Sequence, residues 1–436
     1  MRDIVVASII FGSLPFILRK PYVGVLMWAW IGYMNPHRLT WGFAYNFPFA
    51  EIVGGTTILS VLISKESKRF PVDSLTVVWL IFLVWMGITT LFAIYPESAA
   101  TQYEKILKIQ LMTFFVLMIM GTKERLNALM WVTALSIAFF GVKGGIFTIL
   151  SGGGSKVYGP AGSFIADNNS MALALLMIMP LLYYLRLYEK RMWIRHALAA
   201  SMVLCFASTL GSQSRGAFVA ILCVSGMLWM KAKQKVFLGV ALMAILSVGF
   251  TLMPQSWHKR MDTIETYKQD ASAMGRINAW WYSFNVANDR LTGGGLNSWS
   301  EKTFAKWAPD PKSVHAAHSI YFSVLGDHGW PGLVMFMAIL LMAWRKGSMT
   351  IRQCKNREDL LWAADMARMI QVSMVAYLTG GAFLSLSYFD LPWQMIAMLM
   401  LLQRIVIQEH NVNEAMPTKS TLSKRKISYP ATNGMG

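Results

Sequence analysis

Apolar runs of roughly 15 to 25 residues recur along the chain, and a run of about 20 is long enough to cross a membrane as a helix. Of the 436 residues, 55% are hydrophobic and only 14% are charged, whereas a soluble protein carries about a quarter charged residues. This pattern predicts an all-α polytopic membrane protein with about 12 or 13 transmembrane helices. We place the segments near 4–18, 21–35, 51–64, 75–95, 104–120, 126–150, 170–188, 195–211, 215–231, 236–253, 318–344, 369–388 and 390–407.

Basic residues explain the formal net charge of +18, because they fall in short clusters between the apolar runs. Such clusters are typical of cytoplasmic loops, which are rich in Lys and Arg. We therefore attribute the charge to membrane topology and expect no nucleic-acid partner. The clusters are Arg19–Lys20, Lys65–Arg69, Lys123–Arg125, Lys190–Arg195, Lys231–Lys235, Arg345–Arg368 and Lys419–Lys426.

The basic clusters occupy every second gap between the apolar segments, so the loops in the other gaps are predicted to lie on the outer face. The alternation predicts four parts: N-terminal transmembrane helices over 1–253, a large periplasmic loop over 254–317, C-terminal transmembrane helices over 318–407 and a flexible cytoplasmic tail over 408–436. Within the loop, 258–269 and 275–288 look helical and GGGLNSW looks like a turn. The shorter outer loops are 36–50, 96–103, 151–169, 212–214 and the turn near Asp390.

The sequence leaves open on which side of the membrane the N-terminus lies. The N-terminus is outside if all thirteen segments cross, and inside if one of the first is re-entrant. The first twenty residues have an acid near the start and no small-residue cleavage site, so we expect no signal peptide. Cys205, Cys223 and Cys354 lie in apolar runs or a basic loop, which predicts neither a disulfide framework nor a cysteine metal site.

Three polar residues that are far apart in the sequence map to the predicted outer face. Arg215 begins one apolar segment, Arg276 lies on the large loop, and His318 stands where that loop enters the next segment. Arginine binds phosphate oxygens by paired hydrogen bonds, and histidine takes a proton from a hydroxyl near neutral pH. The set therefore suits a lipid diphosphate leaving group and an attacking alcohol. Lys312 adds positive charge, and His315 lies nearby.

Each of these residues also has a structural interpretation. Arg215 could anchor a helix end at the lipid headgroups, Arg276 could be a solvated surface charge, and His318 could be a helix-end residue. In the loop 151–169, Asn168 or Ser170 suits a helix N-cap better than a sugar contact. We find neither H-E-x-x-H nor a paired outer carboxylate cluster, so we expect no metal and no cofactor.

The sequence resembles the O-antigen ligase family of bacterial membrane glycosyltransferases. The similar stretches are GPAGSFIADNNSMAL at 159–173, SRGAF at 214–218, DASAMGR at 270–276, GGGLNSW at 293–299 and AHSIYFSVLGDHGWPGL at 317–333. The stretch that begins RKPYVGVLMWAW is similar to a subgroup of O-glycosylation ligases associated with exosortase systems.

The resemblance implies transfer of a glycan from undecaprenyl diphosphate to an acceptor hydroxyl at the periplasmic face of the bacterial inner membrane. The acceptor would be a lipid A-core sugar, another glycan or a protein Ser/Thr. The enzyme would then act in the synthesis of exopolysaccharide or lipopolysaccharide. His318 matches the family histidine that activates the acceptor, and Arg215 and Arg276 match the arginines that hold diphosphate. Ser319 stands where many members have Asn, and Asn169 matches a family Asn.

Three other functions remain open at this point. A polymerase that joins repeat units uses the same chemistry and differs in its control of glycan length. A transporter favours paired repeats and charged or broken helices near the midplane, and the sequence shows no internal repeat. A structural membrane scaffold would tolerate changes at Arg215, Arg276 and His318 together.

Overall fold

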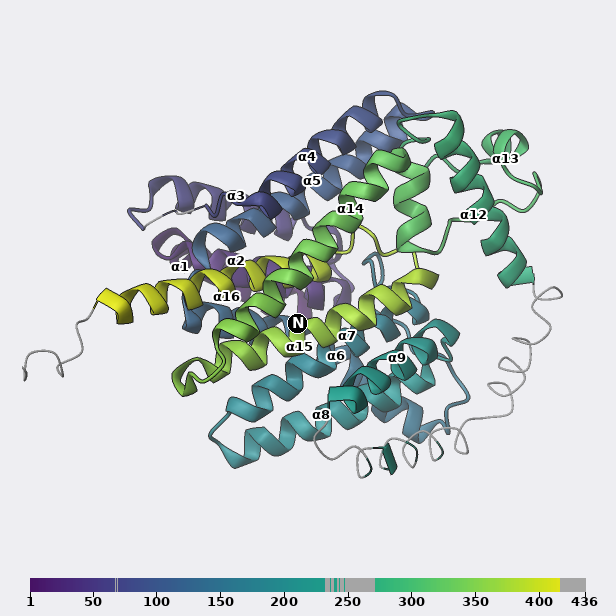
Figure 1. Cartoon of the computed structure of the whole chain (residues 1–436). Coiled ribbons are helices and arrows are strands. Elements are labelled where there is room, and N and C mark those ends of the chain that lie inside the picture. Colours follow the sequence, from purple (N-terminus) through teal and green to yellow (C-terminus); the bar gives the residue numbers. More distant parts are fainter. Residues whose placement is uncertain are drawn as a thin grey trace, which may run out of the picture.

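The computed structural model describes residues 1–66, 68, 70–231 and 271–415, together with the single positions 236, 239, 240, 243 and 247. Within these residues all regular structure is helical, as predicted (Figure 1). The helices are α1 (Arg2–Arg19), α2 (Pro21–Met34), α3 (Phe49–Ile63), α4 (Ser74–Leu91), α5 (Pro96–Ile119), α6 (Lys123–Leu150), α7 (Asn168–Tyr188), α8 (Met192–Gly211), α9 (Arg215–Lys231), α12 (Ala271–Asp289), α13 (Glu301–Trp307), α14 (Ile320–Gln353), α15 (Leu361–Gly380) and α16 (Asp390–Ala415). Short 3-10 turns include η1 (Pro36–Leu39), η2 (Phe43–Asn46), η4 (Glu358–Leu360) and η5 (Gly381–Phe383).

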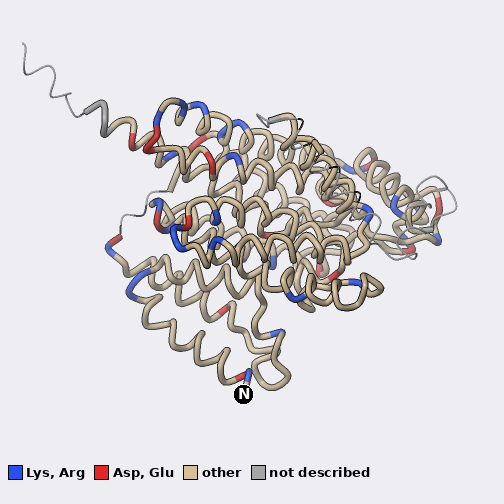
Figure 2. The backbone as a smooth tube through the Cα atoms, turned by 90° about the horizontal axis from the view of Figure 1, so that it is seen from below, with Lys and Arg blue, Asp and Glu red and all other residues tan. Residues whose placement is uncertain are grey.

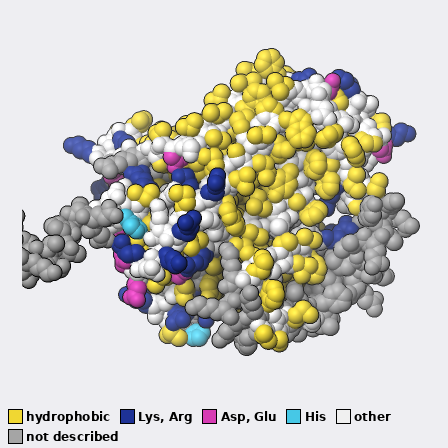
Figure 3. Space-filling model, viewed as in Figure 1, with side chains coloured by type: hydrophobic (Ala, Val, Ile, Leu, Met, Phe, Trp, Pro, Cys, Tyr) yellow, Lys and Arg dark blue, Asp and Glu magenta, His cyan; other side chains and the backbone are white. Residues whose placement is uncertain are grey.

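Six of the described helices are both long and apolar enough to cross a membrane. They are α4, α6, α7, α8, α14 and α16, and the shorter α3 and α9 are also apolar. The predicted number of crossings is larger than this set, and most of one predicted segment, 236–253, lies outside the described residues. Hydrophobic side chains cover much of the surface in Figure 3, and Val84, Val203 and Leu341 are more than 60% exposed. A lipid-facing surface explains such exposure.

The helix starts follow the local sequence. Pro21 and Pro96 open α2 and α5, where a missing N–H costs nothing because the first turn has no partner for it. The side chains of Asp73 and Thr122 cap α4 and α6. The predicted helix at 275–288 is α12, and GGGLNSW forms turns, as expected. The predicted helix at 258–269 and residues 416–436 of the predicted tail lie outside the described residues, and α16 extends past the predicted 390–407 to Ala415.

Three of the loops that carry basic clusters meet at one end of the bundle, toward which many Lys and Arg lie in Figure 2. Arg125 pairs with Glu66 at 2.9 Å, and Lys346 pairs with Asp73 at 2.8 Å. Lys123 lies over the ring of Trp362, so three predicted cytoplasmic loops are in contact. This grouping agrees with the predicted alternation of loops.

The loops predicted on the outer face meet at the opposite end. Gln213 Nε2 donates to Gly153 O at 3.1 Å, and the Tyr95 and Ser300 hydroxyls lie 2.7 Å apart. The N-terminus is at this end too, because Asp3 Oδ1 accepts from the backbone N–H groups of Gly42 and Ala44. Of the two N-terminal placements left open by the sequence, the structure has the one that puts residue 1 with the predicted outer loops.

Candidate functional site

The segment 308–319 leads into α14, and α12 holds it in place through side-chain amides and an indole. Asn278 Nδ2 donates to the carbonyl oxygens of Asp310 and Ser313 at 2.8 and 3.0 Å, and Asn278 Oδ1 accepts from Asp310 N. Trp280 Nε1 donates to Ala317 O at 2.7 Å, and its ring stacks on that of Phe322 at a centroid distance of 5.1 Å. The loop is therefore fixed on both sides of its two histidines.

His318 has a left-handed backbone conformation, with φ of 44°, directly before α14. Residues other than glycine rarely adopt this backbone conformation, and it persists only where the surrounding contacts hold it. Three contacts do so here: Ser385 Oγ accepts from His318 N at 3.0 Å, Trp280 holds the preceding carbonyl, and Ser319 caps α14. The half-buried imidazole is thus carried by a fixed backbone.

Charged groups in α12 and at the N-cap of α7 act on the imidazole of His318. Burial lowers the pKa of His318 below its usual 6.5, and the positive charge of Arg276 and the neighbouring His315 lower it further, while Asp167 acts in the opposite direction. The structure therefore places the charges of Arg276 and Asp167 near enough to His318 to act on its pKa. A lowered pKa leaves the imidazole neutral at pH 7, the form that accepts a proton.

Arg215 is the first residue of α9 and is half-buried. Ser214 caps this helix, since its Oγ accepts from Ala217 N at 3.2 Å. Gly216 packs against Phe383 of η5, and Gly381 of η5 packs against Ile320, the first residue of α14. The helix end that carries Arg215 therefore lies beside the turn that approaches the start of α14.

The other predicted residues occupy different positions around this end. Lys312 is exposed, and its backbone N–H is bound by the carboxylate of Asp310. His315 is exposed, with Nδ1 3.3 Å from Ser313 Oγ, and its ring packs directly against Gly275. Asn169 is half-buried in the first turn of α7, while Ser319 serves as the N-cap of α14.

The N-cap of α7 is Asp167, so the expectation that Asn168 or Ser170 caps this helix is wrong. Asp167 Oδ1 accepts from the backbone N–H groups of Asn169 and Ser170 at 2.9 and 3.0 Å. Asn168 is buried instead and donates to Ser212 O at 2.7 Å. A carboxylate at a helix N-terminus is favoured by the helix dipole, which explains the choice.

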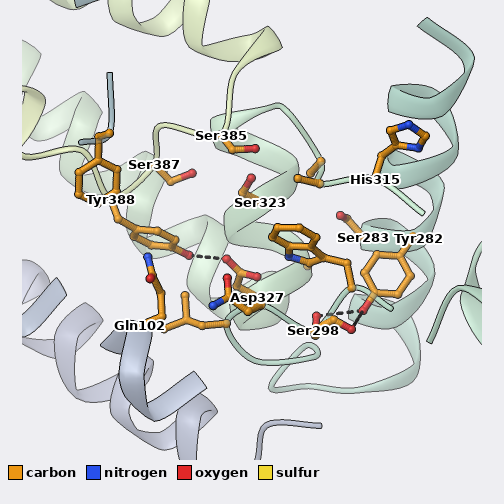
Figure 4. A pocket seen from close by; sticks show the side chains of 17 residues that line it. Gln102, Tyr282, Ser283, Ser298, His315, Ser323, Asp327, Ser385, Ser387 and Tyr388 are labelled. Carbon is orange, nitrogen blue, oxygen red and sulfur yellow. Dashed lines mark hydrogen bonds between the residues drawn. The ribbon is translucent and has the colours of Figure 1, made fainter. Parts of the chain in front are cut away.

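A polar cavity of about 130 Å³ opens between the loop segment and the membrane helices (Figure 4). His315, Ala317 and Ser385 form part of its wall, which joins the cavity to the segment that carries His318. Side chains from α5, α12, α14 and the turn after η5 line the rest, among them Gln102, Ser283, Ser323, Asp327, Ser387 and Tyr388. In the described part of the chain no group of three or more His, Cys, Asp or Glu could hold a metal ion.

The floor of the cavity lies at a break in α14. Pro331 has no N–H to give to Asp327 O, and Gly329 is non-helical, with φ of 67°. The glycine-rich turn supplies the missing donors, since Gly294 N binds Gly326 O at 2.8 Å and Gly295 N binds Asp327 O at 3.0 Å. The GGGLNSW motif therefore supplies hydrogen-bond donors to the carbonyl groups that the break in α14 leaves without partners.

Asp327 and His328 lie buried beside this break, and the sequence alone indicated a role for neither of them. His328 is fully buried, with Nδ1 2.7 Å from Thr89 Oγ1 and Nε2 2.9 Å from the Tyr388 hydroxyl. Tyr388 also donates to Oδ2 of Asp327 at 2.8 Å, and Trp85 Nε1 donates to His328 O. The only signal in the sequence was an Asp-His pair beside Gly329 inside an apolar run.

Comparison with known families divides the chain in two. Residues 1–190 match a family of unknown function (DUF5935), and residues 200–337 match the family described as O-antigen ligase. No curated protein matches the chain. The second match covers most of α8, all of α9, α12 and α13, His318 and the first part of α14. It supports a membrane function of the glycan ligase or polymerase type. The match at residues 200–337 therefore supports placing this part of the multi-pass membrane protein in the O-antigen ligase family.

Proposed function

We propose that this protein is a membrane glycosyltransferase that moves a glycan from undecaprenyl diphosphate to an acceptor hydroxyl at the periplasmic face of the bacterial inner membrane. The acceptor would be a lipid A-core sugar, another glycan or a protein Ser/Thr. The observation that carries the proposal is that Arg276 lies near enough to His318 to lower its pKa. Both residues belong to the part of the chain that matches the O-antigen ligase family, as does Arg215 at the start of α9.

His318 would act as the general base. Its imidazole is neutral at pH 7 because burial and the charge of Arg276 lower its pKa. The acceptor oxygen would attack the anomeric carbon of the glycan while its proton passes to the imidazole. The bond between that carbon and the diphosphate oxygen would break, and the electron pair would leave with the diphosphate. No step of this reaction uses a metal or a cofactor.

Arg276 and Arg215 would bind the diphosphate. An arginine beside a base is unfavourable for the protonated base, so its presence is better explained by an anion that binds there during the reaction. Arg215 stands at the N-terminus of α9, where the helix dipole already favours an anion and disfavours a cation. Both positions suit charge that grows on a leaving phosphate.

The experiment is a gel profile of lipid-linked and acceptor-linked glycan in cells that lack the protein. Wild type, His318→Ala and His196→Ala are supplied back, and His196 is the control because it is exposed on α8 at the end with the basic loops. We expect long lipid-linked glycan to accumulate without the protein and with His318→Ala, and to disappear with wild type and His196→Ala.

Two other results would change this conclusion. Accumulation of single repeat units would show a polymerase. An unchanged lipid-linked pool in cells without the protein would contradict glycan transfer and favour a transporter or a scaffold.

A further inference from the structure

The cavity beneath the loop presents polar groups whose hydrogen-bonding capacity the protein does not use. Within the described residues, Ser323 Oγ and the side-chain amide of Gln102 make no hydrogen bond to the protein, and both half-buried residues line the cavity. Asp327 is 8% exposed, and only its Oδ2 is engaged, by Tyr388. Polar groups that converge on a cavity and make no contact within the protein are typical of ligand sites, so these groups indicate a ligand that supplies hydroxyls.

The chemistry of the wall narrows the class of ligand. Hydroxyl, amide and carboxyl groups line the cavity beside aromatic and aliphatic side chains, and its described lining residues include no Lys or Arg, so an anion such as diphosphate is not favoured there. Trp299 is 44% exposed at the same cavity and offers an aromatic face. A sugar ring has hydroxyls around its edge and apolar C–H faces, and it satisfies both kinds of wall.

The size and location of the cavity agree with this class. A cavity needs about 10–15 Å³ of this measure to hold one water molecule, and this one measures about 130 Å³. Ser385 lines the cavity and also accepts the hydrogen bond from His318 N. A ring bound here would therefore share Ser385 with the backbone that carries the proposed base.

We propose that this cavity binds one pyranose ring of a glycan substrate, with Asp327, Ser323 and Gln102 as its hydrogen-bonding groups and Trp299 as its aromatic face. The identity of the ring as a substrate rests on the proposed glycan transfer, whereas the binding of a sugar does not. The ring would belong either to the acceptor or to the lipid-linked donor, since both are carbohydrates.

Binding is tested by saturation-transfer NMR on the full-length protein in lipid nanodiscs, because maltoside detergents carry the group under test. The probes are the methyl glycosides of glucose, galactose and N-acetylglucosamine, each offered separately. Ser323→Leu fills the cavity, and Ser201→Leu makes the same change on α8, where the Ser201 hydroxyl binds only its own helix. Asp289→Asn, on an exposed residue, is the control for Asp327→Asn.

We expect transfer to at least one glycoside with wild type, Ser201→Leu and Asp289→Asn, its loss with Ser323→Leu and a reduction of about fivefold in affinity or more with Asp327→Asn. A signal from none of the glycosides, or one that Ser323→Leu leaves intact, would overturn the proposal. Far-UV circular dichroism of each variant checks that the helices remain.

A second measurement identifies the source of the ring. Initial transfer rates are measured with lipid-linked glycan and unmodified acceptor, both extracted from cells that lack the protein. A rise of about fivefold in the KM for acceptor with Ser323→Ala assigns the ring to the acceptor, and the same rise in the KM for donor assigns it to the donor. Unchanged KM values for both would contradict the proposal. Absence of transfer by wild type would instead contradict the proposed function and leave the NMR result standing.

Discussion

Thr89 Oγ1 lies 2.7 Å from Nδ1 of His328, and this buried contact joins the two segments of the chain that match different families. Thr89 belongs to α4, within residues 1–190, whereas His328 belongs to the O-antigen ligase domain. Trp85, one turn earlier on α4, donates to the carbonyl of the same histidine at 2.9 Å. The N-terminal helices therefore complete the hydrogen bonding of the break in α14 above which the candidate site is built.

Trp85→Phe should lower the stability of the protein without altering its surface charge. The change leaves His328 O without its donor at the break, and an unpaired carbonyl in a buried setting costs about 1–3 kcal/mol. The measurement is the thermal unfolding midpoint in nanodiscs. Trp193→Phe is the control, because Trp193 is 69% exposed on α8. Equal midpoints for the two variants would show that the carbonyl finds another donor.

Arg276→Ala should reduce the transfer rate by about a hundredfold or more, because a well-placed donor to developing charge contributes about 3–4 kcal/mol. Arg276→Lys should recover part of the rate, since it keeps the charge and loses the paired geometry. Lys302→Ala is the matched control, because Lys302 is exposed on α13 of the same loop. Near-normal transfer by Arg276→Ala would remove this arginine from the proposed site.

The acid limb of the rate profile should report the pKa of His318. Its pKa lies below 6.5 because of burial and the charge of Arg276, so the rate should rise with pH through a pKa below 6.5 and level off by pH 7. Asp167→Asn removes a charge that favours imidazolium, which moves the limb to lower pH, while Asn still caps α7. Arg276→Ala moves it to higher pH. An acid limb that neither variant moves would contradict His318 as the base.

Ser385→Ala should slow transfer by about fivefold while leaving the His318 side chain in place. The variant removes the acceptor for His318 N, and a hydrogen bond of this kind contributes about 1 kcal/mol. Ser385→Thr keeps the hydroxyl and should retain most of the rate. The expected loss is in kcat, since Ser385 would orient the base. If Ser385→Thr and Ser385→Ala lose the same activity, the hydroxyl does not position His318.

Most of the fold could be predicted from the sequence because its signals are local. A run of apolar residues shows that a segment is a helix in lipid, and the alternation of Lys and Arg clusters shows which loops share a face. That alternation was enough to place Arg276 and His318 at the same end, where the charge of Arg276 lowers the pKa of His318. The extent of individual helices was less certain, as α14 continues to Gln353 past the predicted 344.

The contacts that define the site could not be read in this way. Ser385 meets His318, Asp167 adds its charge from α7, and Tyr388 and Thr89 enclose His328, each from a helix or turn far along the chain. The sequence alone determined that this is a helical membrane protein with polar groups gathered at one face. Only the tertiary structure decided which of those groups touch, because the pairing depends on how neighbouring helices pack and on where α14 breaks. No periodicity within one segment encodes either of these.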